Sequence, residues 1–174
     1  RTIQALLLTR LAEEPDTIAA TFSGEDLSWR QLHQRAARVA AILAHLGVGA
    51  GDVAAQMTGN TADHVAFVFG AALLGAIECP VNTALQGDSL AHVIGHSTAR
   101  VVFAERAFAP QLEVVAARLE DVTVVFWGEG EAPVLAGGAV RTAAEAGFGP
   151  LANAPIDVVR PQDASTLIYT SGTT

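Results

Sequence analysis

The stretch "VAFVFGAALLGAIECPVN", residues 65–82, places a helix, a glycine and a strand in immediate succession. The helix, expected over roughly 61–74, is apolar on nearly every side, which indicates that it is buried on several faces. Gly70 and the two alanines after it leave room for a neighbouring element to come close. Gly75 ends the helix, and "AIECPV" then predicts a strand that ends at Pro80. A buried helix that leads into a buried strand is typical of an α/β fold.

Helical and extended patterns alternate on both sides of this stretch. The serine and glutamine of "SWRQ" predict a capping box that starts a helix at Ser28, and Gly47 ends that helix. The other expected strands are "DVAAQM" (52–57), "RVVFA" (100–104), "VTVVFW" (122–127) and "STLIY" (165–169), with further helices near 88–96 and 110–119. Residues 128–161 read as a surface connection with one short helical pattern near 142–146. Strands separated by helices predict a mostly parallel sheet flanked by helices.

Composition excludes several classes of protein. The chain has 174 residues and a formal net charge of -8, and all ten of its basic residues are arginines. Such an acidic chain without a basic stripe is a poor candidate for binding nucleic acid or an anionic membrane. A single cysteine, Cys79, forms no disulfide within the chain, so a reducing cytoplasm is the expected location and a small buried side chain its expected role.

No segment of the sequence is predicted to span a membrane. The most apolar run, residues 65–77, is shorter than the roughly 18–20 apolar residues that a bilayer requires, and Glu78 ends it. The first sixteen residues, "RTIQALLLTRLAEEPD", lack a cleavage-site pattern and contain charged residues among the leucines. They predict an amphipathic helix rather than an export signal.

Four polar features are candidates for chemistry, but the simpler interpretation is favoured for each. "GVGAGD" (47–52) follows a helix rather than a strand, so it is a helix stop and a turn, not a dinucleotide-binding motif. "HVIGH" (92–96) places two imidazoles on one helical face, but it lacks the glutamate of the zinc-protease motif, which favours solvated histidines. Asp63 and Glu78 have no partner that the sequence reveals.

The last residues, "TSGTT", combine hydroxyl groups with backbone N–H groups and one glycine. The side chains are those of Thr170, Ser171, Thr173 and Thr174, and Gly172 would let a ligand approach the backbone. Placed after a parallel strand, such a loop can surround a polyphosphate through neutral donors. For these five residues taken alone, a polar turn is the favoured interpretation.

Longer stretches of the chain resemble the adenylate-forming enzymes, which include acyl-CoA synthetases, adenylation domains of nonribosomal peptide synthetases and luciferases. "YTSGTT" (169–174) is similar to the start of their phosphate-binding signature, which continues with glycine, a variable residue, proline and lysine. Residues 27–52 and 65–82 resemble the first two core motifs of the family, and residues 88–103 resemble the helix-then-strand segment that follows them, in the expected order. Four matching stretches in order favour phosphate binding over the polar turn.

The resemblance implies that residues 1–174 are the N-terminal part of the large domain of such an enzyme, ending within the phosphate-binding loop. The rest of that domain, with the magnesium-binding glutamate, and the C-terminal domain with the catalytic lysine would be absent, so the chain alone is expected to be inactive. The implied reaction is ATP-dependent formation of an acyl-adenylate from a carboxylic acid, followed by thioester formation with coenzyme A. Only Thr170, Ser171, Gly172, Thr173 and Thr174 carry over, as phosphate-binding residues; no catalytic or metal-binding residue is expected within the chain.

Three functions remain open. "CPVN" (79–82) and "TARVVF" (98–103) favour an acyl-CoA ligase of fatty acid metabolism over the peptide-synthetase branch. The first alternative is an adenylation domain that loads an amino or aryl acid onto a carrier protein. The second alternative is a truncated, non-catalytic homologue that acts as a binding domain.

Overall fold

A parallel β-sheet forms the centre of the molecule. A computed structural model describes residues 2–119, 121–127, 133–135, 139–142 and 159–170. The sheet has five strands in the order β4-β3-β5-β6-β7, and every neighbouring pair is parallel. The strands are β3 Val53–Met57, β4 Ile77–Pro80, β5 Val101–Glu105, β6 Thr123–Trp127 and β7 Ala139–Thr142. The predicted α/β fold with a mostly parallel sheet is confirmed.

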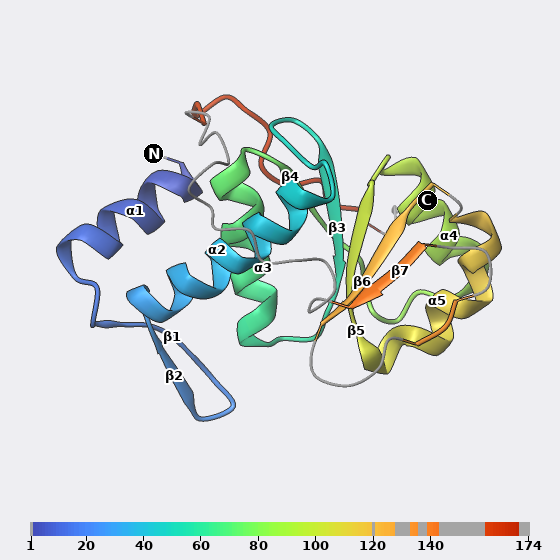
Figure 1. Ribbon diagram of the computed structural model, residues 1–174, viewed down its shortest axis with the longest axis horizontal. Coiled ribbons are helices and arrows are strands. Elements are labelled where there is room, and N and C mark those ends of the chain that lie inside the picture. The colour runs from blue at the N-terminus through green and yellow to red at the C-terminus, as the bar shows by residue number, and fades with distance from the viewer. Residues whose placement is uncertain (1, 120, 128–132, 136–138, 143–158, 171–174) are drawn as a thin grey trace.

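Helices cover both faces of this sheet (Figure 1). One apolar cluster joins α2 and α3 to one face of the sheet, and a second joins α4 and α5 to the other. The helices are α1 Ile3–Glu13, α2 Trp29–His45, α3 Ala62–Leu74, α4 Gly87–His96 and α5 Ala109–Val115, with 3₁₀ turns at Arg106–Phe108 and Ala116–Arg118. Neighbouring residues of the central strands face opposite clusters, Ala54 the first and Ala55 the second. The sheet is therefore buried on both faces, as parallel sheets usually are.

The predicted capping signals are present at the helix ends. The Ser28 hydroxyl accepts a hydrogen bond from the Gln31 backbone N–H, and the Gln31 side chain accepts one from the Ser28 N–H. Gly47 and Gly75 follow α2 and α3 with φ angles of 80° and 70°, the left-handed conformation that glycine adopts without strain. These signals act over a few residues, which is why the sequence alone predicted them.

Gly70 allows the closest approach between α2 and α3. A Cβ atom added to it would lie 2.7 Å from Val39 Cβ and 2.9 Å from the carbonyl oxygen of Ala36. Carbon atoms in packed proteins lie about 3.5–4.0 Å apart, so no side chain fits in this position. The close approach expected from the small residues of α3 is confirmed.

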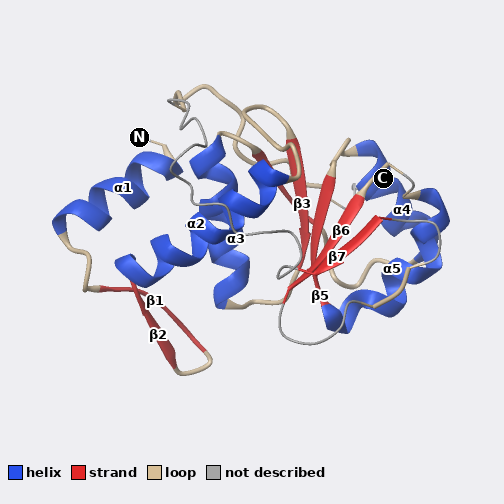
Figure 2. Ribbon diagram, in the orientation of Figure 1, coloured by secondary structure: helices blue, strands red, loops and turns tan. Residues whose placement is uncertain are grey.

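A small antiparallel hairpin precedes α2 and was not predicted. Its strands are β1 Ile18–Phe22 and β2 Glu25–Ser28, and it projects away from the main sheet (Figure 2). The two turn residues, Ser23 and Gly24, have positive φ angles of 49° and 85°. Two left-handed residues between paired strands match a two-residue hairpin turn. The Ser-Gly pair was therefore the signal that could have predicted the hairpin.

The strand predicted over residues 165–169 is a single parallel bridge between Thr166 and Glu78 of β4. The Glu78 N–H donates to the Ser165 carbonyl at 2.9 Å, and the Leu167 N–H donates to the Glu78 carbonyl at 2.8 Å. In parallel pairing the next donor on this side of β4 would be residue 80. That residue is Pro80, which has no N–H, so the ladder stops after one residue.

Two further expectations concern less regular parts of the chain. The short helix predicted near 142–146 is not found at Thr142, which ends strand β7 instead, and residues 143–146 lie outside the described residues. Within the described part of the chain, every helix is too short or too polar to cross a bilayer.

Candidate functional site

The carboxyl ends of the parallel strands meet at one edge of the sheet. From β3 the chain passes through α3 to β4 on one side, and from β5 it passes through α5 to β6 on the other. The connections that leave the adjacent parallel strands β3 and β5 therefore run to opposite sides of the sheet, one to β4 and the other to β6. In open α/β sheets, ligands bind at the carboxyl edge near such a switch point.

The segment that leads to the predicted phosphate-binding loop runs along this sheet towards the same edge. Because its bridge to β4 is parallel, the chain after Thr166 continues in the direction of the strands. Thr170, the first of the five predicted phosphate-binding residues, is exposed. Ser171, Gly172, Thr173 and Thr174 lie outside the described residues, so their phosphate-binding role stays a prediction.

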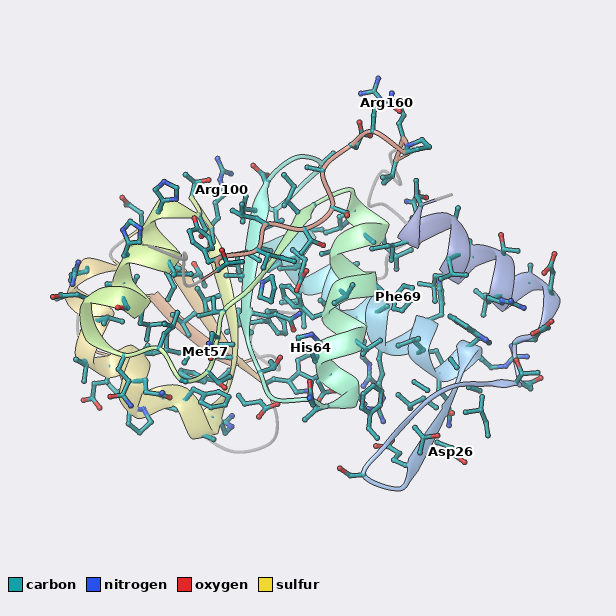
Figure 3. The ribbon with its side chains drawn as sticks, turned by 180° about the vertical axis from the view of Figure 1, so that it is seen from behind. Asp26, Met57, His64, Phe69, Arg100 and Arg160 are labelled. Atoms are coloured by element: carbon teal, nitrogen blue, oxygen red, sulfur yellow. The ribbon has the colours of Figure 1, made fainter. Side chains whose placement is uncertain are left out.

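A buried chain of hydrogen bonds links β4 to α3 beneath this edge. The Glu78 carboxylate, 4% exposed, accepts a hydrogen bond from Gln56 Nε2 at 2.9 Å. The Gln56 side-chain oxygen accepts one from the Thr58 hydroxyl at 3.1 Å, and that hydroxyl lies 3.0 Å from His64 Nδ1. Figure 3 shows His64 between α3 and the sheet. Sequence reasoning found no partner for Glu78, because the partner comes from a strand 22 residues earlier.

Glu105, at the carboxyl end of β5, closes the loop between β3 and α3. Its Oε1 atom accepts hydrogen bonds from the Gly59 N–H at 3.1 Å and from the Thr61 hydroxyl at 3.2 Å. Thr61 is also the N-cap of α3, where its oxygen accepts a hydrogen bond from the His64 N–H. One carboxylate thus fixes both the loop and the start of the helix at the switch point.

Asp63 lies in the first turn of α3 beside charged neighbours. Its carboxylate is 3.7 Å from the Arg35 guanidinium, which also forms an ion pair with Glu25. Partial burial raises the pKa of Asp63 above its ordinary value, although Arg35 acts in the opposite direction. The partners that the sequence did not reveal are therefore Arg35 of α2 and Trp127 of β6, whose side chain forms a hydrogen bond with the carboxylate.

The two histidines of α4, His92 and His96, are exposed, as the sequence predicted, and His96 contacts the segment before the predicted loop. Their rings stack with centroids 5.3 Å apart. His96 Nδ1 lies 2.7 Å from the Tyr169 hydroxyl, and the two rings meet edge to face. The described residues contain no group of three or more His, Cys, Asp or Glu side chains that could hold a metal ion. His96 therefore connects α4 to Tyr169, the residue just before the predicted loop.

Comparison with known proteins shows which family the chain belongs to. The model of the family "AMP-binding enzyme" matches residues 7–174. Indigoidine synthase of Streptomyces lavendulae is 31% identical over 173 residues, which are 99% of this chain and 12% of that protein. The 4-hydroxybenzoate–CoA/benzoate–CoA ligase of Rhodopseudomonas palustris is 32% identical over 149 residues, 85% of this chain and 26% of that protein.

A solved structure has the same fold. The anthranilate CoA ligase AuaEII, in complex with anthranoyl-AMP, superposes with a TM-score of 0.79 at 24% identity, over 100% of this chain and 33% of that one. The parallel sheet with helices on both faces is thus the fold of one part of that enzyme. The chain belongs to the AMP-binding enzyme family, the adenylate-forming enzymes that its motifs resemble. It spans about a quarter or less of the length of the two curated relatives named above.

Proposed function

We propose that this chain is the N-terminal part of the large domain of an AMP-forming carboxylic acid–CoA ligase that ends within the phosphate-binding loop. The observation that carries the proposal is the position of "TSGTT", directly after a segment that runs parallel to β4 towards the carboxyl edge. The family match extends through the same residues. The substrates would be ATP, a carboxylic acid and coenzyme A.

The proposed role of the loop follows from where charge develops in the first half-reaction. The carboxylate oxygen attacks the α-phosphorus of ATP, the bond to the bridging oxygen breaks, and pyrophosphate leaves with the negative charge. Hydroxyl and N–H donors already arranged around the β- and γ-phosphates stabilise that charge with little rearrangement. Gly172 would let the phosphates approach the backbone, because a side chain there would hold them away.

Magnesium would neutralise phosphate charge in this reaction. The glutamate that binds it in the family matches no position of this chain. The residues from 1 to 174 are therefore proposed to bind phosphate only, and to be inactive without the remainder of the enzyme. A single buried cysteine suits a cytoplasmic enzyme, which is the location we propose.

The acceptor of the acyl group has a second candidate. One relative, the fatty acid–[acyl-carrier-protein] ligase ScoC of Streptomyces coeruleorubidus, has a carrier protein in its name and is 32% identical over 67% of this chain. In the sequence, Asn82 favoured coenzyme A. In the structure its side-chain oxygen accepts a hydrogen bond from the Ala84 N–H at 2.9 Å. An aspartate would accept the same bond, so this position gives little support to either acceptor.

Two measurements on the complete enzyme test the proposal. Acid-dependent exchange of pyrophosphate into ATP reports the first half-reaction, and release of AMP from supplied acyl-adenylate by coenzyme A reports the second. Replacing Thr173 or Ser171 with alanine should slow the first step by about 10–1000-fold, by analogy with the roughly 100–1000-fold lost when a single oxyanion-hole donor is removed. The second step should change much less.

The matched control is Thr21→Ala, which removes an exposed hydroxyl from the hairpin, where it donates a hydrogen bond to Asp26 at 2.6 Å. It should leave both half-reactions unchanged. Equal slowing of both steps by the loop variants would contradict the phosphate-binding role. Acceptance of a phosphopantetheinylated carrier protein but not of coenzyme A would favour the second candidate.

A further inference from the structure

Tyr169 is the last side chain with a defined contact before the predicted phosphate-binding loop. It follows the single bridge at Thr166 by three residues, and Leu167 and Tyr169 both pack against the second apolar cluster. Ile168, between them, points away and is 67% exposed. This alternation is that of an extended segment, with one side turned towards α4 and α5. The tyrosine ring therefore lies on the surface of the domain while the backbone continues into Thr170.

The hydroxyl of this tyrosine is bonded to α4. His96 Nδ1 and the Tyr169 oxygen are 2.7 Å apart, and their ring centroids are 5.7 Å apart at an interplanar angle of 86°. When Nδ1 is unprotonated the phenol donates to it, and when Nδ1 carries a proton the imidazole donates to the phenol oxygen. The contact is therefore available in either state of the histidine. The His92 ring also stacks on His96, at an interplanar angle of 29°.

The contact between His96 and Tyr169 helps to hold the segment that precedes the loop. Pro80 limits the backbone pairing with β4 to one residue, so the segment before the loop has few backbone bonds to hold it. A loop that is already oriented loses less conformational freedom when it binds a ligand, and its affinity rises accordingly. Burial also raises the pKa of the Tyr169 phenol, which keeps its proton at neutral pH.

We propose that His96 is a positioning residue for the phosphate-binding loop, acting through the hydroxyl of Tyr169. The inference rests on the proposed function, because it gives this contact the task of orienting a loop that binds ATP. It assigns a role to a histidine that the sequence predicted only as a solvated residue on a helical face.

The experiment measures binding of a non-hydrolysable Mg-ATP analogue to the complete enzyme by calorimetry. Tyr169→Phe removes only the hydroxyl, and His96→Phe keeps a ring but removes the bond. Each variant should weaken binding by about two- to tenfold, the range for one net hydrogen bond. The double variant should be no weaker than the single ones, because both remove the same bond. His96→Gln, which can still bond to the phenol, should recover part of the affinity.

The control is His45→Phe, a change of the same kind at an exposed position in the last turn of α2. It should bind the analogue like the unmodified enzyme. Steady-state kinetics provide a second readout: the KM for ATP should rise in the Tyr169 and His96 variants while the KM for the acid does not. Variants that melt earlier but bind the analogue normally would show a merely structural contact and overturn the inference.

The failure of the inference and that of the proposed function can be told apart. Unchanged affinity for the analogue in both single variants, or additive losses in the double variant, would overturn the inference alone. An unmodified enzyme that binds no Mg-ATP analogue would overturn both. Binding of the analogue with the expected losses, but without any acid-dependent exchange, would support the positioning role and contradict the ligase reaction.

Discussion

Replacing Gly70 with alanine should destabilise the domain, although alanine is the better helix former. The added methyl group would lie 2.7 Å from Val39 Cβ and Cγ1 and 2.9 Å from the Ala36 carbonyl oxygen. Relief of these contacts requires α2 and α3 to separate by about 1 Å, since packed carbons lie about 3.5–4.0 Å apart. Overpacking of this kind costs about 1–3 kcal/mol, and a stiff β-branched partner favours the upper part of that range.

Helix propensity offsets part of this cost, by about 1 kcal/mol for glycine to alanine. The expected net loss is therefore about 2 kcal/mol in the free energy of unfolding, measured by urea denaturation. The matched control is Gly95→Ala in α4, where an added Cβ would meet nothing within 4 Å. It should stabilise the domain by about 0.5–1 kcal/mol. A Gly70→Ala variant as stable as the control would refute the reasoning.

Three other predictions follow from buried polar groups. Gln56→Leu should lower the free energy of unfolding by about 1–3 kcal/mol, because the buried Glu78 carboxylate loses its recorded donor, and urea denaturation measures this loss. Burial raises the pKa of Asp63, so the folded state binds a proton at this side chain more tightly than the unfolded state does. Ionisation of Asp63 therefore lowers the free energy of unfolding as pH rises above about 4. The unfolding free energy of Asp63→Asn should therefore increase relative to the original protein between pH 4 and 6. Burial raises the pKa of Cys79 to about 11, so iodoacetamide at pH 8 should label it only as fast as the protein unfolds.

The sequence predicted the parts of the fold that local chemistry determines. The capping box at Ser28 and the left-handed glycines depend on residues near one another in the chain. The small residues around Gly70 predicted that a neighbour comes close, but not that this neighbour is α2. The hairpin before α2 was missed because its strands are largely exposed, with Leu27 as their one buried residue, so their sequence shows no core-facing pattern. The strand at 165–169 was overestimated because its pairing depends on Pro80, far away in the sequence.

In the candidate site, too, local features were predicted and long-range contacts were not. The resemblance placed the loop, and it needed no knowledge of the sheet. The bonds from Gln56 to Glu78 and from His96 to Tyr169 join residues 22 and 73 positions apart. A single sequence contains no signal for such pairs, because which side chains meet is decided by the order of the strands. They became visible only when the fold had brought β4 between β3 and the final segment.

The one-residue pairing at Glu78 also bears on the order in which the chain assembles. Strands β3 to β6 and their covering helices bury two apolar clusters, almost all of whose buried members precede residue 128. The final segment adds two backbone bonds to an edge that those strands have already formed. During synthesis it would pack last, on a sheet that has already folded, and it could later detach by local unfolding while the sheet stays folded.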